Sequence, residues 1–185
     1  MMTPDHVLTF WFAGDSSVWR DVWFKKDAAF DAACGAFASV LHDARTGAFD
    51  TWADTPRGAL ALLILLDQLS RNLYRGSADA FAADPKARRV ARAAIDRGFD
   101  RALAPNERVF MYLPFEHTED LADQDDSVRL FETLRGSIGD TAADSARKHQ
   151  ELIQRFGRFP HRNAALGRVS TPEEEDYLAQ PGAGF

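Results

Sequence analysis

The feature that most constrains the fold is the run Ala59 to Leu66, in which every residue is apolar. Thr55 and Pro56 precede it in the order that begins helices, a capping hydroxyl followed by proline in the first turn. A helix that is apolar on all sides must be surrounded by other elements. The sequence therefore predicts a helix at the centre of the molecule. The run is far shorter than the ~20 residues that span a bilayer, so we expect no membrane insertion.

Helix signals recur along the rest of the chain, whereas the apolar-polar alternation of strands does not occur and β-branched residues are scarce. We expect Gly14, Gly47 and Gly98 to end helices and Pro114 to perturb or end another. Helices are expected to begin near Pro4, Asp27, Pro56, Asp84, Pro105, Asp123, Thr141 and Thr171. The predicted fold is all-α, with antiparallel helices joined by short loops in a single domain, residues 1–185.

The net charge limits the classes of binding partner that we expect, and the cysteine content bears on the cellular compartment. The net charge of −6 argues against a dedicated nucleic-acid or membrane-surface binder, because both need broad positive faces. The arginines between residues 88 and 101 are interpreted as a solvated helix face. Cys34 is the only cysteine, so an intramolecular disulfide is impossible. With no basic-then-apolar leader after Met1, the expected location is the cytoplasm.

A polar group follows the apolar run directly. Asp67 and Arg71 are four residues apart and share one helix face, followed by Asn72. One interpretation is an intrahelical ion pair with Asn72 closing the helix. The other is that the central helix delivers these side chains into a shared pocket, because burial without partners would cost several kcal/mol.

Histidines and acids form a second group of candidates. His117 lies near carboxylates in helical register, and Glu119 lies beside it, which suits a general base or a metal site. The acids from 123 to 126 also suit the start of a helix, where they would be caps and solvated charge. His149 lies on an apolar helix face, where a hydrogen-bonded core histidine is the competing interpretation.

The segment from 155 to 168 alternates arginines with aromatic residues and glycine. Several guanidinium groups in a compact loop can bind a phosphate or carboxylate. The competing interpretation is that they pair with acids near 116–126 and hold the C-terminal segment to the body. Within this segment the candidate ligand-binding residues are Arg158, His161, Arg162 and Asn163.

Three motifs in order resemble the bacterial family of domains of unknown function numbered 924. They are Leu65–Gln68 with Arg71–Asn72, Tyr112–Asp120 and Phe156–Asn163. The resemblance covers nearly the whole chain, and it implies a helical fold similar to tetratricopeptide-repeat proteins, in which hairpins stack. It implies no activity. Ser70 stands where the family pattern leads us to expect a proline.

Two functions remain open. The first is a binding protein or enzyme for an anionic small molecule; the second is a protein-interaction module that binds a peptide or helix between helical hairpins. The candidate catalytic residues are Asp67, His117, Glu119 and His149, and the candidate ligand-binding residues are Arg71, Asn72, Arg158, His161, Arg162 and Asn163. The spacing of the histidines gives no metal-ligand signature, and no cofactor can be named.

Overall fold

The apolar run forms the centre of the molecule in this computed structural model, which describes residues 2–184. The central helix begins with α4 (Pro56–Leu63), passes through a π-helical stretch (Ile64–Leu69) and ends with α5 (Ser70–Leu73). Thr55 caps it by accepting a hydrogen bond from the amide of Gly58. Every residue from 58 to 70 is buried, which confirms the prediction of a surrounded helix.

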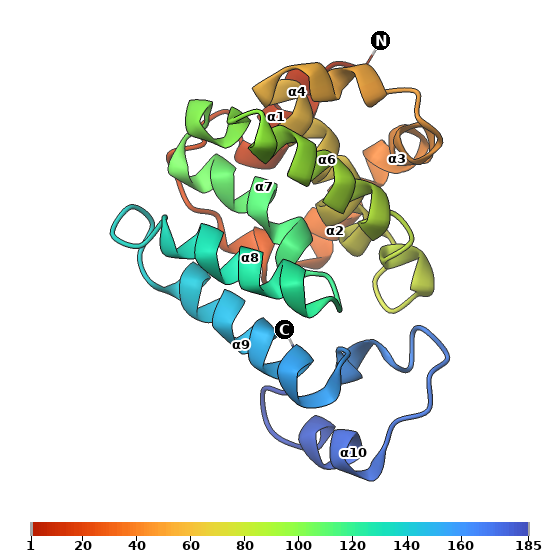
Figure 1. Cartoon of the computed structure of the whole chain (residues 1–185). Helices are drawn as coiled ribbons and strands as arrows, with labels where there is room; N and C mark the ends of the chain where they lie inside the picture. Colours follow the sequence, from red (N-terminus) through yellow and green to blue (C-terminus); the bar gives the residue numbers. More distant parts are fainter. Residues whose placement is uncertain (1, 185) are drawn as a thin grey trace.

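Helices from both halves of the chain cover the central helix. Those in contact with it are α1 (Pro4–Phe12), α2 (Ala28–Cys34), α3 (Ala38–Thr46), α6 (Asp84–Asp96) and α7 (Pro105–Glu116). Figure 1 shows them packed around it in the upper part of the molecule. Between residues 2 and 184 no strand forms, so the all-α prediction is confirmed for the described chain.

In the second half of the chain, consecutive helices pack side by side in a layer. Helix α8 (Leu121–Glu132) packs between α7 and α9 (Thr141–Phe156), and consecutive helices run in opposite directions (Figure 1). The last helix, α10 (Pro172–Leu178), lies beyond α9. A small separate core of Leu152, Ile153 and Phe159 forms in this region, with Tyr177 packed against it.

Most predicted helix boundaries agree with the structure, and the differences have local causes. The expected helix after Asp27 is divided by a 3₁₀ turn at Gly35–Phe37. Pro114 does not end α7, which continues to Glu116. Helix α8 begins before Asp123 because Asp120 caps it by accepting a hydrogen bond from the Asp123 amide.

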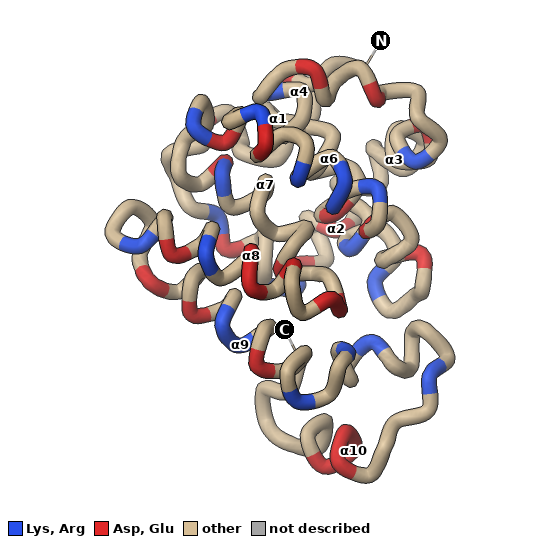
Figure 2. Tube along the Cα trace, viewed as in Figure 1, with Lys and Arg blue, Asp and Glu red and all other residues tan. Residues whose placement is uncertain are grey.

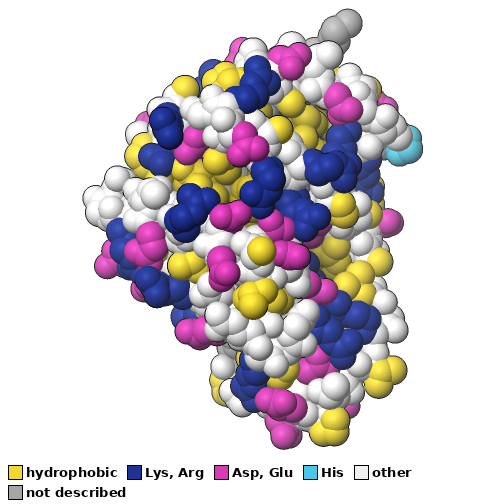
Figure 3. Space-filling view, in the orientation of Figure 1, with side chains coloured by type: hydrophobic (Ala, Val, Ile, Leu, Met, Phe, Trp, Pro, Cys, Tyr) yellow, Lys and Arg dark blue, Asp and Glu magenta, His cyan; other side chains and the backbone are white. Residues whose placement is uncertain are grey.

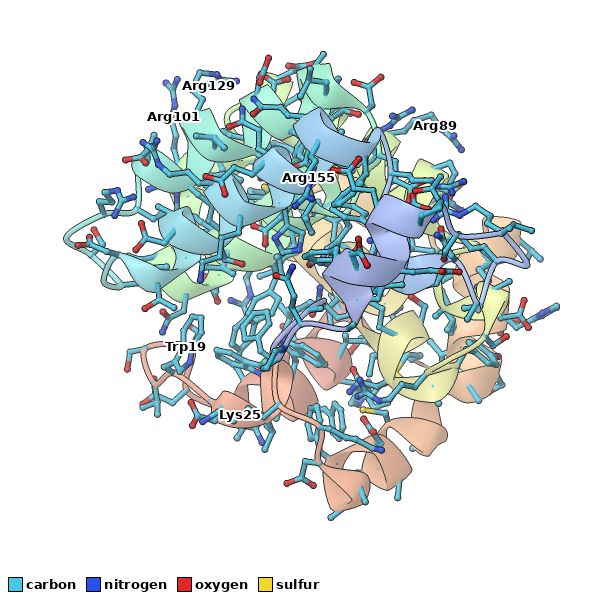
Figure 4. The ribbon with its side chains drawn as sticks, turned by 90° about the horizontal axis from the view of Figure 1, so that it is seen from below. Trp19, Lys25, Arg89, Arg101, Arg129 and Arg155 are labelled. Carbon is cyan, nitrogen blue, oxygen red and sulfur yellow. The ribbon has the colours of Figure 1, made fainter. Side chains whose placement is uncertain are left out.

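The surface mixes charges of both signs over the same elements (Figures 2 and 3). Arg88 and Arg92 of α6 contact Asp123 at 2.8 and 2.5 Å, and Arg92 also contacts Asp126 of α8. Arg89 and Arg101 project outward at the periphery (Figure 4). The arginines of α6 therefore lie among acids rather than in a continuous basic face. None of the helices within residues 2–184 has the length and apolarity needed to cross a bilayer.

Candidate functional site

A cavity of about 540 Å³ lies between the loop after α1, the C-terminal part of the central helix, α7, α9 and the segment Pro160–Arg162. Trp19 and Lys25, labelled in Figure 4, belong to that loop and line the cavity at its exposed side. Its ionisable and amide lining residues include Gln68, Arg71, Asn72, Glu116, His117, His149, His161 and Arg162. The cavity thus brings together residues from all three sequence motifs.

The central helix delivers Asp67 and Arg71 to one side of this cavity. Its π-helical turn occurs where the apolar run gives way to Asp67, a kind of irregularity that is frequent at functional sites. Arg71 contacts the Asp67 carboxylate at 3.1 Å and donates two hydrogen bonds of 2.9 Å to Asp84. The intrahelical ion pair forms and Arg71 also lines the cavity, but Asn72 does not close the helix, which continues to Leu73.

His117 lies over the buried Asp67 carboxylate. Its Nδ1 is 2.8 and 3.0 Å from the two carboxylate oxygens. A carboxylate only accepts hydrogen bonds, so Nδ1 carries the proton and Nε2 carries the lone pair. Burial opposes ionisation of Asp67, but Arg71 and His117 outweigh it and hold the pKa of Asp67 below its usual range. Burial and Arg71 lower the pKa of His117, which favours the neutral imidazole.

Glu116 adds a second ionisable pair at the end of α7. Its Oε1 accepts a hydrogen bond from the Ser145 hydroxyl at 3.0 Å and lies 3.0 Å from Nδ1 of His149. That nitrogen also lies 2.9 Å from the Ser145 carbonyl oxygen, which only accepts, so Nδ1 of His149 is the protonated nitrogen. Burial raises the pKa of Glu116 to about 8 and lowers that of His149 well below its usual range. Their contact therefore joins two neutral groups rather than two ions.

Arg162 is a buried cation with one long ion pair and no carboxylate within hydrogen-bond distance among the described residues. Its guanidinium lies over the rings of Phe81 and Phe159, 4.6 and 4.5 Å from their centroids. The nearest carboxylate contact is Asp84 at 3.7 Å, and Nε is buried with no hydrogen-bond partner in the described structure. Burial and the neighbouring Arg71 lower the pKa of Arg162 to about 10. An anion entering the cavity would compensate this charge.

Six of the predicted residues line the cavity: Arg71, Asn72, His117, His149, His161 and Arg162. Asp67 lies directly behind His117. Asn72 donates a hydrogen bond to Asp31 at 2.7 Å, which ties it to α2. Burial and Arg162 lower the pKa of His161 to about 4. Within residues 2–184 no group of three or more His, Cys, Asp or Glu residues has an arrangement that could hold a metal ion.

Besides Asp67, three predicted residues lie outside the cavity lining, and each contacts neighbouring side chains. Glu119 forms hydrogen bonds of 2.7 and 2.9 Å with Arg168 and accepts one from the Phe159 amide. Arg158 and Asn163 both contact Glu174 at the start of α10. The Glu119 contacts attach the C-terminal segment to the body, as the competing interpretation expected, whereas Arg158 and Asn163 pair with Glu174 inside that segment rather than with the acids near 116–126.

The sequence interpretation did not select Glu116, nor the rings of Trp19 and Phe24 as cavity-lining residues. One signal pointed to Glu116: it is an acid at the C-terminal end of a mostly apolar helix, where the helix dipole disfavours negative charge. Trp19 and Phe24 are 41% and 49% exposed, and no spacing rule marks them as part of this cavity.

Comparisons with known proteins agree with this architecture. One solved structure, described as a protein of unknown function, ATU0120, from Agrobacterium tumefaciens, superposes with a TM-score of 0.88 at 41% identity. The match covers 96% of this chain and 97% of the other. No curated protein matches the chain. Residues 7–182 match the family model described as bacterial protein of unknown function (DUF924), and the chain therefore belongs to that family.

Proposed function

We propose that this protein binds a small molecule bearing an anionic group and transfers a proton to or from it. The observation that carries the proposal is the meeting of Arg71 and Arg162 with the His117–Asp67 pair and Glu116 around one cavity. The cavity volume lies within the range of about 300–1,000 Å³ found for small-molecule sites.

Arg162 favours an anion, because it is the lining cation with the longest carboxylate contact, whereas Arg71 pairs with Asp67 and Asp84 and Arg75 pairs with Asp31. The cations that line the cavity are Lys25, Arg71, Arg75 and Arg162, and the acids are Asp21 and Glu116. Glu116 is mostly protonated at neutral pH because its pKa is raised to about 8. The guanidinium of Arg162 is planar and offers several donors to a carboxylate or phosphate. We assign Arg162 and Arg71 to ligand binding, together with His161 and Asn72 at the lining.

Acid and base functions are divided between neighbouring residues. The neutral His117, held in one tautomer by Asp67, has a lone pair on Nε2 and suits a general base. Glu116 stays protonated near neutral pH and suits a general acid; its buried Oε2 has no hydrogen-bond partner among the described residues. Environments that shift the pKa values of two neighbouring groups in opposite directions are typical of acid-base pairs. His149 positions Glu116 through their contact.

The second candidate is a protein-interaction module with a tetratricopeptide-repeat-like array. The sequential packing of α7, α8 and α9 favours it, as do the exposed Val18, Trp19 and Phe24 on one loop. In this candidate a peptide or helix would occupy the same opening. The cavity favours the small molecule, because buried or partly buried ionisable groups from four segments, Arg71, Glu116, His149 and Arg162 among them, line it together.

The test is ligand-induced stabilisation. We expect members of a panel of phosphorylated and carboxylated metabolites to raise the thermal midpoint of the purified protein, because binding to the folded state alone stabilises it. Arg162→Gln should reduce that increase strongly, and Arg162→Lys should retain more of it. Arg129→Gln is the matched control, because Arg129 is exposed on α8 away from the cavity (Figure 4).

The opposite result would overturn the proposal. If no anion in the panel stabilises the wild-type protein, and folded Arg162→Gln and His117→Gln proteins behave as the wild type does, the cavity is not an anion site. Stoichiometric binding of a defined peptide that is insensitive to both substitutions would favour the interaction module instead.

A further inference from the structure

The cavity has a chemical gradient along its length. Three residues of α7 line it, in the order Val109, Leu113 and Glu116, and His117 follows directly after the helix. At 1.5 Å per residue, Val109 and Glu116 are separated by about 10 Å along the helix axis. The lining of α7 therefore changes from aliphatic to ionisable over about 10 Å.

Helix α9 has the same gradient in the same direction. Its lining residues run from Thr141 and Ala142 through Ser145 to His149. The two gradients are aligned, because Ser145 contacts Glu116 at 3.0 Å and the rings of His149 and His117 are 6.3 Å apart. One end of the cavity is therefore ionisable on both helices and the other end is apolar on α7 and small or weakly polar on α9.

Aromatic rings close the apolar end. Trp23 and Phe24 lie 4.9 and 6.1 Å from the ring of Phe110, in the N-terminal half of α7. Phe131 of α8 also lines the cavity and lies 5.8 Å from the Tyr112 ring. The loop that carries Trp23 and Phe24 also brings the ion pair of Asp21 and Lys25 to the lining, and the large uncharged side chains of this end are mostly aromatic.

Two of these rings form an exposed pair. Trp19 and Phe24 stack with centroids 5.4 Å apart and planes 19° apart. They remain 41% and 49% exposed although both line the cavity. A ring of a ligand seated against them would remove their apolar surface from water and gain ring-ring contact energy.

The geometry points to an aryl-bearing anion as the ligand class: a molecule whose carboxylate or phosphate lies near Arg71 and Arg162 and whose aromatic body extends about 10 Å toward Trp19, Trp23 and Phe24. This inference rests on the proposed function and adds the apolar half of the ligand. A free phosphate or acetate would fill only a small part of a 540 Å³ cavity. An aliphatic chain would gain burial without the ring-ring contacts that the aromatic wall offers.

The experiment measures dissociation constants by titration calorimetry for acetate, butyrate, hexanoate, 4-phenylbutyrate, 2-phenylethyl phosphate and the neutral 4-phenylbutyramide. We expect 4-phenylbutyrate to bind at least tenfold more tightly than butyrate and several-fold more tightly than hexanoate. The amide should bind at least tenfold more weakly than the acid. Comparison of 4-phenylbutyrate with 2-phenylethyl phosphate identifies the preferred anionic group.

Variants separate the two ends of the cavity. Trp19→Leu keeps an apolar side chain without the indole, so it should weaken 4-phenylbutyrate binding about fivefold and leave butyrate binding unchanged. Arg162→Gln should weaken both ligands about tenfold. Leu121→Ala is the control, because Leu121 is 45% exposed on α8 and does not line the cavity.

The outcomes distinguish this inference from the proposed function. Equal affinities for butyrate and 4-phenylbutyrate would overturn the aryl preference and leave the anion site intact. Equal affinities for the acid and its amide would overturn the anion site itself. The absence of binding by both aryl anions at millimolar concentration would overturn the aryl preference, whatever the metabolite panel shows.

Discussion

Nδ1 of His117 lies 2.8 Å from Oδ1 of Asp67, although 50 residues of chain separate them. Asp67 comes from the π-helical turn of the central helix, and His117 follows the last residue of α7. The same carboxylate contacts Arg71, so one buried charge orients an imidazole and a guanidinium at once. The packing of α7 on the central helix therefore places the candidate base.

Asp67→Asn should remove this charge while keeping the side-chain volume. We expect a loss of about 2–3 kcal/mol in the free energy of unfolding at pH 7, because a buried pair loses one partner while Arg71 retains Asp84. The pKa of Asp67 is lowered in the folded state, so its stabilising effect is present above the ordinary carboxyl pKa and disappears as the pH falls below it.

Urea unfolding at several pH values measures this effect. Asp43→Asn, on the exposed face of α3, is the matched control. The pKa of His117, followed by NMR, should fall further in Asp67→Asn, since the Asp67 carboxylate raises it. An unchanged His117 pKa would show that the two side chains do not interact in solution.

Glu116→Gln tests a raised carboxyl pKa, whereas Asp67→Asn tests a lowered one. The folded pKa of Glu116 is about 8, above its ordinary value of 4.5, so its contribution to stability is present below pH 4.5 and is lost as the pH rises toward 8. The glutamine variant carries no such proton. We therefore expect the variant to gain stability relative to the wild type between pH 5 and 9, by a few kcal/mol at most.

Paired unfolding curves across that pH range provide the measurement. Glu151→Gln, at an exposed position of α9, should keep a constant difference from the wild type. A constant difference for Glu116→Gln as well would mean that Glu116 is already ionised in the folded protein, and the general-acid assignment would fail.

The fold was largely predictable because its signals are local. Thr55 and Pro56 mark the start of the central helix, and Gly47 ends α3 in the left-handed conformation that glycine adopts readily. Features that depend on tertiary contacts were not predictable. The break at Gly35–Phe37 occurs in a segment whose apolar spacing is helical throughout.

The sequence indicated which residue types could form the candidate site, but it did not indicate which side chain each of them contacts. The sequence analysis selected His117 and Glu119, two residues apart, as candidate catalytic residues on the same grounds. Three-dimensional packing separates them, because α7 ends at Glu116 and the chain then turns, leaving His117 over Asp67 and Glu119 beside Arg168. The arginines likewise divide into paired residues such as Arg158 and the incompletely paired Arg162.

Glu119→Gln should therefore affect stability and not ligand binding. Its bidentate contact with Arg168 and its bond to the Phe159 amide hold the C-terminal segment, so we expect a loss of about 2 kcal/mol. Amide exchange over residues 157–170 should become faster. Glu173→Gln, which removes an exposed pair with Arg155, should change stability little. Loss of ligand binding in a folded Glu119→Gln protein would return Glu119 to the candidate site.

Gly58→Ala tests how closely the central helix is surrounded. Helix propensity alone predicts that alanine stabilises this position by about 1 kcal/mol. However, a Cβ at residue 58 would lie 2.1 Å from the Trp52 carbonyl oxygen and 2.8 Å from Oγ1 of Thr55, so backbone has to move. We expect a net destabilisation of about 2–3 kcal/mol.

Gly35→Ala is the matched control for this substitution. Residue 35 is also helical, with φ of −53°, and an added Cβ there would meet nothing within 4 Å. Alanine should therefore leave stability unchanged or raise it by up to about 1 kcal/mol, because it restricts the unfolded chain. Chemical unfolding of both variants gives the comparison. If Gly58→Ala were as stable as Gly35→Ala, the close approach of the Asp50–Asp54 turn to the start of α4 would be wrong.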